Sequence, residues 1–274
     1  MVAHPHLPDV SGLLLTYRLF VYRAVLLAVT RIELGKRYAG SFLGPLWYPI
    51  YWAALLGMYC FVYIVVFRQR IPEFGNFGYI LFIFSGLIPY FGVSDAIGNG
   101  AGSIRGNMAV VRNAIFPVDL IPAKVVLVAL ASQAVAVGFL VILAIAGGFG
   151  GWHLLYLPVP FVGEFLLVLG VVWALSAITV VVPDIQQVTS LLLWLFLFIS
   201  PVGFKPDQVP AGFQWIVYVN PLTYLIEEFR FALLGIRTID LTTSLLGFGL
   251  FSIAFLLIGA AIFRRLMVAF GDYQ

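Results

Sequence analysis

Long apolar runs dominate the chain, and polar residues are confined to short stretches between them. A bilayer core needs about 20 apolar residues per helix, and six runs reach or approach this length. They predict six transmembrane helices, at about residues 47–67, 79–94, 124–146, 158–182, 188–204 and 245–263. The chain is therefore expected to be an all-α membrane protein, with one transmembrane domain over residues 1–274.

The stretch at residues 12–34 is apolar but carries regularly spaced polar residues. Thr16, Arg23 and Thr30 recur every seven residues and, with Arg31, form a narrow polar stripe. This pattern is typical of an interfacial helix that lies in the headgroup plane. The alternative is a helix packed on the bundle with its arginines extended to water. No small-residue cleavage pattern follows, so a signal peptide is not expected.

Proline and glycine interrupt the chain after the fifth run. Two moderately apolar pieces, 213–219 and 222–234, are each too short to cross a bilayer. They predict re-entrant helices on the outer side, within residues 205–235, between spans five and six. Irregular backbone at membrane depth requires protein or a water-filled cavity around it, so this segment is expected to cap or line a pathway.

The basic residues predict the orientation of the chain. If the N-terminus lies in the cytoplasm, ten Lys and Arg residues fall inside and five outside, which satisfies the positive-inside rule. Both termini are therefore expected to be cytoplasmic. The inner group is Arg18, Arg23, Arg31, Lys36, Arg37, Arg105, Arg112, Lys124, Arg264 and Arg265, and the outer group is Arg68, Arg70, Lys205, Arg230 and Arg237.

Composition excludes several classes of protein. Of 274 residues, 62% are hydrophobic and only 10% are charged, which leaves no room for a sizeable water-soluble domain and excludes a soluble enzyme. A formal net charge of +3, scattered along the chain, does not indicate a nucleic-acid surface. Cys60 is the sole cysteine, and His4, His6 and His153 lack metal-ligand spacing, so no metal site is expected.

Catalytic and nucleotide-binding patterns are also absent from the sequence. No lysine lies in the G-x-x-x-x-G-K-[ST] frame that cradles phosphates, so ATP-driven transport would need another chain. Glu164 is the one ionisable residue inside a predicted span, near its outer end. An ion-coupled carrier would place such a residue in mid-membrane. The alternative is a carboxylate that reaches the interface or fills a polar gap.

The first predicted span is rich in aromatic residues. Tyr48, Tyr51, Trp52, Tyr59 and Tyr63 share one broad helical face, and the last two lie too far along the helix for an interfacial belt. A tyrosine ring offers a flat apolar surface to the C–H face of a sugar and a hydroxyl to its rim. We therefore expect this face to line a sugar pathway, facing Trp194 and Phe198 of the fifth span. Packing between helices is the alternative.

Several motifs, in a shared order, carry a family resemblance. Residues 37–47 (R-Y-A-G-S-F-L-G-P-L-W) resemble the start of the first span in type-2 ABC exporter permeases of the polysaccharide-export branch. Further matches are Gly86 to Tyr90, Asn107 to Pro117 with Leu120 to Pro122, Asp184-Ile185, Ser200-Pro201, Val209-Pro210, Asn220 to Leu222, and Arg230. By pattern the chain is most similar to O-antigen exporter permeases, with teichoic-acid and capsule exporter permeases as sister groups.

The resemblance implies a transport subunit of the bacterial inner membrane rather than an enzyme. It implies a homodimer docked on two ATP-binding cassette subunits, which bind ATP and Mg²⁺, while this chain holds no cofactor. The substrate would be a lipid-linked polysaccharide that passes between the two copies. Residues 98–119 would hold a coupling helix, with Arg105, Asn107, Arg112 and Asn113 contacting the ATPase; a solvated loop is the alternative.

Two other functional classes compete with an exporter at this stage. One is a channel or ion-coupled carrier, which would lose transport with the ion gradient rather than with ATP. The other is a membrane-embedded transferase, which would modify a lipid-linked sugar without a partner. An ATPase with a phosphate-binding loop, acting together with this chain, would favour the exporter.

Overall fold

The structure, a computed structural model, describes residues 12–37, 40–66, 75–112 and 117–267. All regular secondary structure in these ranges is helical, as expected. The α-helices are α1 (Gly12–Val21), α2 (Arg23–Arg37), α3 (Trp47–Cys60), α4 (Gly75–Ala101), α5 (Ser103–Gly106), α6 (Met108–Arg112), α7 (Leu120–Ala146), α8 (Pro158–Val181), α9 (Ile185–Ile199), α10 (Gln214–Val219), α11 (Pro221–Leu234) and α12 (Leu241–Met267). Short turns of other helix types are η1 (Gly44–Leu46), the π-helical η2 (Phe61–Val66), η3 (Trp152–Tyr156), η4 (Pro206–Gln208) and η5 (Ala211–Phe213).

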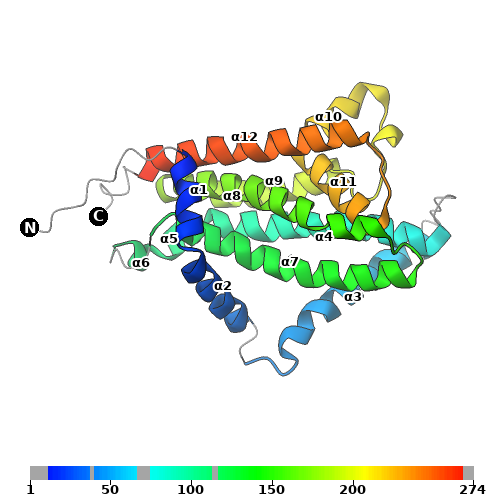
Figure 1. Ribbon diagram of the computed structural model, residues 1–274, viewed down its shortest axis with the longest axis horizontal. Helices are drawn as coiled ribbons and strands as arrows, with labels where there is room; N and C mark the ends of the chain where they lie inside the picture. The colour runs from blue at the N-terminus through cyan, green and yellow to red at the C-terminus, as the bar shows by residue number, and fades with distance from the viewer. Residues whose placement is uncertain (1–11, 38–39, 67–74, 113–116, 268–274) are drawn as a thin grey trace, which may run out of the picture.

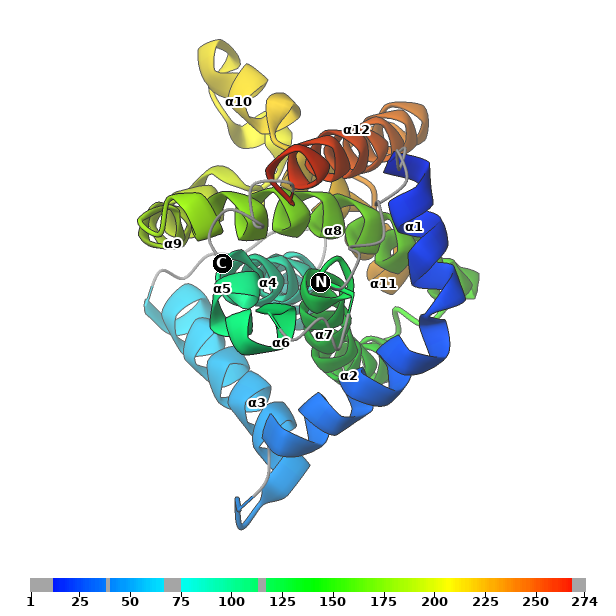
Figure 2. The same ribbon diagram turned by 90° about the vertical axis from the view of Figure 1, so that its left-hand side faces the viewer.

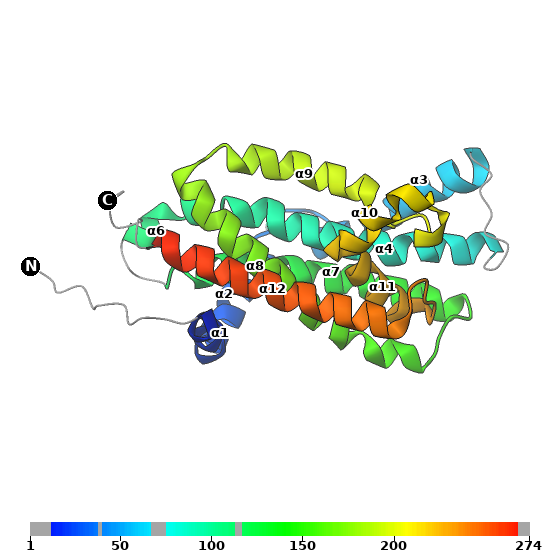
Figure 3. The same ribbon diagram turned by 90° about the horizontal axis from the view of Figure 1, so that it is seen from above.

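The long helices form an elongated bundle (Figure 1). Viewed along its axis, α4 and α7 lie at the centre, with α3, α8, α9 and α12 around them (Figure 2). The helices α5 and α6 lie at one end of the bundle, and α10 and α11 at the other (Figures 1 and 3). Helix α9 lies at the edge of the bundle in both the axial view and the view from above (Figures 2 and 3).

Four described helical segments are long and apolar enough to cross a membrane: Phe77–Ala101, Leu120–Ala146, Trp152–Val181 and Leu241–Met267. Two shorter apolar helices, Ile50–Tyr59 and Ile185–Ile199, correspond to the first and fifth predicted spans. The chain is thus a multi-pass membrane protein by length and composition. Four of the six predicted spans therefore correspond to helices that are long and apolar enough to cross a membrane, and the other two correspond to the shorter helices.

Small residues allow α8 and α12 to approach closely. A Cβ atom on Gly259 of α12 would lie 1.9 Å from the carbonyl oxygen of Gly170 in α8, and one on Gly170 would lie 2.2 Å from the carbonyl oxygen of Phe255. No side chain larger than hydrogen fits at either position. Since lipid tails are as apolar as the helices, such backbone contact is a main source of helix association in a membrane.

A polar pair lies in the centre of the bundle between α7 and α8. Glu164 is fully buried and accepts a hydrogen bond of 2.8 Å from Gln133 Nε2. The side chain of Gln133 in turn rests on Gly92 of α4, where a Cβ atom would lie 1.7 Å from Gln133 Oε1. Glu164 therefore fills a polar gap between helices, which is one of the roles that the sequence analysis considered for this carboxylate.

For two predicted spans, the observed helix ends five or more residues away from the predicted C-terminal boundary. Helix α4 continues through Asp95, the charged residue that follows the predicted span. Asp95 accepts a hydrogen bond from Asn99 one turn later, and both residues stay in the helix. Helix α9 ends at Ile199, five residues before the predicted boundary. Ser200 adopts an extended conformation. It precedes Pro201, and the helical conformation is disfavoured for the residue before a proline.

The N-terminal segment forms two helices that run across the bundle axis (Figures 1 and 2). This crosswise course agrees with an interfacial helix. The polar stripe, however, does not face one environment: Thr30 is buried, whereas Arg23 is exposed and lies 4.4 Å from the ring of Phe20. Helix α2 also contacts α7, so part of the N-terminal segment packs on the bundle, as in the alternative of a packed helix.

Candidate functional site

A groove follows α4 and α9 on the outside of the single chain. Its larger part has a volume of 630 Å³ and lies between α3, α4, α9 and the turn after α9. A smaller part of 240 Å³ continues along the same helices as far as Gly98. Trp194 and Leu197 line both parts, so the two form one strip, which we call the α4–α9 groove.

Three of the predicted channel-lining residues meet in this groove. Tyr59, Trp194 and Phe198 all line its larger part. The indole of Trp194 is 63% exposed and the ring of Phe198 is 77% exposed in the single chain. Tyr59 is half-buried and makes an edge-to-face contact with Phe84 of α4, with 6.1 Å between ring centroids.

The other predicted aromatic residues lie elsewhere. Tyr51 is 56% exposed and lies outside the α4–α9 groove. Trp52 is buried, with edge-to-face contacts to Tyr51 and to Phe91 of α4, so in the single chain it packs between helices. Tyr48 and Tyr63 belong to α3 and η2, but their side chains lie outside the described part of the structure.

Two tyrosines of α4 that the sequence analysis did not select also line the groove. The hydroxyl of Tyr79 donates a hydrogen bond to the carbonyl oxygen of Gly203 at 3.4 Å, and that of Tyr90 donates to the carbonyl oxygen of Leu193. Ser94 and Ser190 add hydroxyls to the smaller part. The residues of α4 that line the groove recur every three or four positions, at 79, 83, 87, 90, 94 and 98, and therefore lie on one helical face. This spacing is the sequence pattern from which Tyr79 and Tyr90 could have been selected.

Buried ionic contacts fix the turn that closes the larger part of the groove. Arg230 of α11 is fully buried and donates hydrogen bonds to the carbonyl oxygens of Pro201 and Val202, at 2.9 and 3.2 Å. It pairs with Glu227 at 2.8 Å, and its guanidinium carbon lies 3.7 Å from the ring centroid of Phe82 in α4. Arg230 thus ties α11, the turn after α9, and α4 together.

The asparagine before Pro221 supports the same turn. Asn220 Nδ2 donates a hydrogen bond to Ser200 Oγ at 2.9 Å, and its Oδ1 caps α11 by accepting from the Leu222 amide at 3.0 Å. An asparagine at this position satisfies an otherwise unpaired amide at the helix N-terminus. The Ser200-Pro201 and Asn220-Pro221 motifs therefore pack on each other.

The described part of the predicted coupling stretch up to Arg112 is mostly helical. Residues up to Ala101 extend α4, and α5 and α6 follow as short helices. Arg105 is exposed, and Asn107 Nδ2 donates a hydrogen bond of 2.8 Å to the Ser103 carbonyl. Arg112 lies in α6 with its side chain outside the described part, and Asn113 lies outside the described residues altogether.

The first turn of α9 adjoins this stretch. A Cβ atom on Gly102 would lie 2.9 Å from Gln186 Oε1, so the two segments are in contact. Arg105 and Gln186 therefore lie near each other at one end of the bundle, where α5 and α6 lie (Figure 1).

An ion pair joins the N-terminal segment to the same end. Arg18 Nη2 lies 3.2 Å from Asp119 Oδ1, just before α7 begins. Burial raises the pKa of the Asp119 carboxyl, and the charge of Arg18 opposes that rise. The indole of Trp173 in α8 donates a hydrogen bond of 3.1 Å to the Asp119 carbonyl, which connects this corner to the bundle.

Among the described residues, no group of three His, Cys, Asp or Glu side chains is placed to hold a metal ion.

Comparison with known proteins identifies the family. The model of the family described as ABC-2 type transporter matches residues 26–234. The chain belongs to the ABC-2 type transporter family. Permeases of this family are transport components rather than enzymes, and they work with an ATP-binding ATPase subunit.

Curated relatives of this ABC-2 permease carry export names. It is 29% identical, over 79% of its length and 82% of the relative, to "O-antigen export system permease protein RfbA" of Myxococcus xanthus. It is 25% identical to a protein of the same name from Klebsiella pneumoniae, over 95% and 99% of the two chains. It is also 25% identical to "Polysialic acid transport protein KpsM" of Escherichia coli, over 85% and 89%.

Proposed function

We propose that the chain is the transmembrane subunit of an ATP-driven exporter that moves lipid-linked polysaccharide across the bacterial cytoplasmic membrane. The observation that carries this proposal is family membership together with full-length similarity to a protein named as an O-antigen export permease. The O-antigen of lipopolysaccharide is therefore the favoured substrate. Of the two relatives named as O-antigen export permeases, one has a higher sequence identity to this chain than the polysialic acid transport protein, and the other matches a larger share of the chain.

The proposed topology has six spans and an outer re-entrant pair. The four long spans are joined by α3, which η2 extends, and by α9, while α10 and α11 enter the membrane from outside without crossing it. Arg264 and Arg265 end α12, and Arg105 belongs to α5 at the same end of the bundle, which supports a cytoplasmic placement of that end.

The proposed pathway lies between two copies of the chain. Exposed apolar side chains on α3 and α9, such as Tyr51, Leu195 and Phe198, favour a membrane or protein partner on this flank. The α4–α9 groove offers aromatic rings with hydroxyl groups between them, a surface on which successive sugars can stack without a deep energy minimum. Tyr59, Trp194 and Phe198 are the proposed contacts.

The proposed energy source is a pair of ATPase subunits, which bind ATP and Mg²⁺. The contact would be made by α5 and α6, with Arg105 and Asn107, together with the first turn of α9 at Gln186. An ion-coupled carrier is disfavoured, because Glu164 is hydrogen-bonded inside the protein and not placed along a pathway. A capsule exporter is the second candidate, favoured by the similarity to the polysialic acid transport protein.

A deletion strain tests the proposal directly. Removal of the chain should abolish surface polysaccharide while a lipid-linked glycan accumulates inside the cell, and the wild-type chain should restore export only with an ATPase whose phosphate-binding lysine is intact. The accumulated glycan distinguishes O-antigen from capsule. Unchanged surface polysaccharide of both kinds in the deletion strain would refute the exporter.

A further inference from the structure

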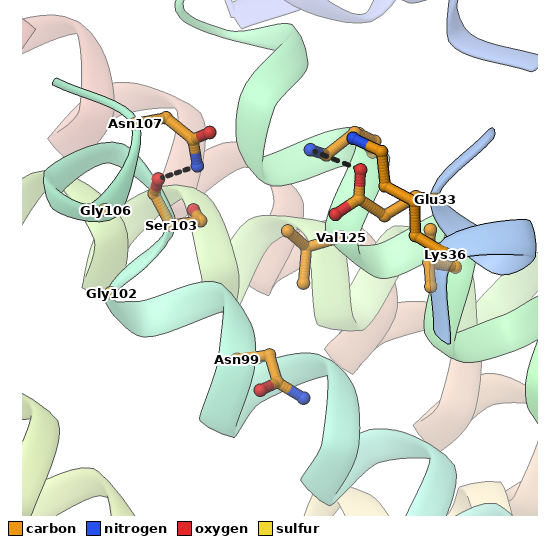
Figure 4. A pocket seen from close by; sticks show the side chains of 10 residues that line it. Glu33, Lys36, Asn99, Gly102, Ser103, Gly106, Asn107 and Val125 are labelled. Atoms are coloured by element: carbon orange, nitrogen blue, oxygen red, sulfur yellow. Dashed lines mark hydrogen bonds and ion pairs between the residues drawn. The ribbon is translucent and has the colours of Figure 1, made fainter. Parts of the chain in front are cut away.

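A polar pocket of 530 Å³ lies where α2, α4, α5 and α7 meet (Figure 4). Glu33 and Lys36 reach it from α2, Asn99 from the last turn of α4, Ser103 from α5, and Lys124 from the first turns of α7. Figure 4 shows Asn99 and Asn107 on one side of the pocket and the two α2 side chains on the other. This pocket is separate from the α4–α9 groove.

The pocket lies at the depth of lipid headgroups. The second candidate span ends at Ala101, and the third begins at Leu120, next to the pocket residues Asn99 and Lys124. The ends of membrane-crossing helices lie at the level of the phosphate groups of the bilayer. A lipid headgroup is therefore the ligand available at highest local concentration.

The charge of the pocket is positive overall. Lys124 Nζ lies 3.5 Å from Glu33 Oε2, and the Lys124 side chain is only 14% exposed. Lys36 lines the same pocket and forms no ion pair with the residues that the structure describes. Two ammonium groups thus face a single carboxylate, which leaves one positive charge for an anion.

A buried hydroxyl points to a missing partner. Ser103 is 5% exposed, and its Oγ has no hydrogen-bond partner among the described residues. Leaving a buried polar group unpaired is unfavourable, and a phosphate oxygen in the pocket would accept this hydrogen bond. The unpaired Ser103 hydroxyl supports an anionic ligand independently of the two lysines, because neither lysine forms a hydrogen bond with it.

We infer that this pocket binds the phosphate headgroup of a membrane lipid. The ammonium groups of Lys36 and Lys124 contact the phosphate oxygens, and the Ser103 hydroxyl donates a further hydrogen bond. Glu33 neutralises Lys124 when the pocket is empty and opposes the phosphate when it is filled. Because α5 forms one wall, an occupied pocket braces the segment that we propose contacts the ATPase, although lipid binding itself does not depend on that function.

Native mass spectrometry of the full-length protein, titrated with phosphatidic acid, tests this inference. The Lys36→Gln/Lys124→Gln double variant should bind about tenfold more weakly, on the scale of one lost charged hydrogen bond. Ser103→Ala, which keeps all charges, should weaken binding several-fold. Glu33→Gln should tighten binding because it removes the opposing charge. Arg31→Gln removes an exposed charge from the same helix and serves as the matched control.

Two comparisons identify the ligand. Diacylglycerol, which lacks the phosphate, should bind all variants equally. Inorganic phosphate should not displace phosphatidic acid at millimolar concentration if the lipid is the ligand, and displacement would assign the site to a free phosphate and overturn the lipid assignment. A double variant and a Ser103→Ala variant that both bind phosphatidic acid as the Arg31→Gln control does would overturn the site itself.

Discussion

The guanidinium group of Arg230 is fully buried and bonded on several sides. Its partner Glu227 also accepts hydrogen bonds from the amides of Thr238 and Ile239, at 2.7 and 3.0 Å. A buried ion pair that is satisfied in this way costs much more to break than to keep. Arg230 therefore acts as a positioning residue for the turn at Pro201, and through it for the larger part of the α4–α9 groove.

Replacing Arg230 by Met should destabilise the protein by about 3 kcal/mol, the scale for breaking a buried ion pair. Glu227 keeps its amide donors, but the carbonyl oxygens of Pro201 and Val202 lose theirs. Thermal unfolding of the detergent-purified protein measures the change. Arg105→Met removes an exposed charge and should change stability by no more than about 0.5 kcal/mol; equal losses in the two variants would contradict the positioning role.

The aromatic residues divide by exposure into two groups with different expected phenotypes. Tyr59→Leu and Trp194→Leu should reduce polysaccharide export while the assembled complex stays at normal abundance, because these rings line the groove. Because Trp194 is largely exposed and Tyr59 is half-buried, each change should destabilise the protein by about 1 kcal/mol, the usual scale of a single substitution. Export per folded complex is the measurement.

Trp52→Leu supplies the control for this pair. Trp52 is buried against Phe91, so its loss should lower the abundance or stability of the protein rather than export per complex. Normal export from a fully expressed variant with Tyr51, Tyr59 and Tyr63 all changed to Leu would contradict a lining role for the first span. The exporter proposal would survive, since it depends on family membership.

At the scale of elements, the lengths of the apolar runs predicted most helices to within a few residues. The pieces at 213–219 and 222–234 correspond closely to α10 and α11, because proline and glycine mark their ends in the sequence. Charge-based boundaries were less successful. Asp95 is retained inside α4 by a hydrogen bond to Asn99, and a one-dimensional charge rule contains no information about such local partners.

Residues that line the groove were predictable where aromatic side chains recur along one helix, and unpredictable where two helices must meet. Tyr59 was selected from the aromatic face of the first span, and it lines the same groove as Trp194 and Phe198, which were expected to face it. The burial of Trp52 depends on Phe91 of another helix, and the contact between Gly102 and Gln186 joins segments more than eighty residues apart. Such contacts depend on helix packing, which the order of residues along one helix does not specify.

The contact between Gly102, just before α5, and Gln186, in the first turn of α9, leads to a prediction about the ATPase. After Cys60 is replaced by Ala, single cysteines at Arg105 and at Gln186 should both crosslink to the ATPase subunit, since the two positions lie on one surface. A cysteine at Phe213, at the opposite end of the bundle, is the control and should not react. Crosslinking from Gln186 alone would refute the assignment of α5 as a coupling element.

At the scale of the whole molecule, the asymmetry of charge predicts the orientation of the chain in the membrane. The end that contains α5 carries Arg18, Arg105, Lys124, Arg264 and Arg265, whereas the charges around α11 are largely neutralised by buried pairs such as Glu227–Arg230. Lys and Arg near span ends are retained in the cytoplasm during insertion. The end with α5 is therefore the expected cytoplasmic end.

Reporter fusions test this orientation. Alkaline phosphatase, which is active only outside the cytoplasm, should be inactive when fused after Gln274 and active when inserted at Gln208 in the turn before α10. A green fluorescent protein fused after Gln274 should be bright. An active phosphatase at Gln274 would reverse the last span, place α10 and α11 on the cytoplasmic side, and remove the basis for a six-span chain with an outer re-entrant pair.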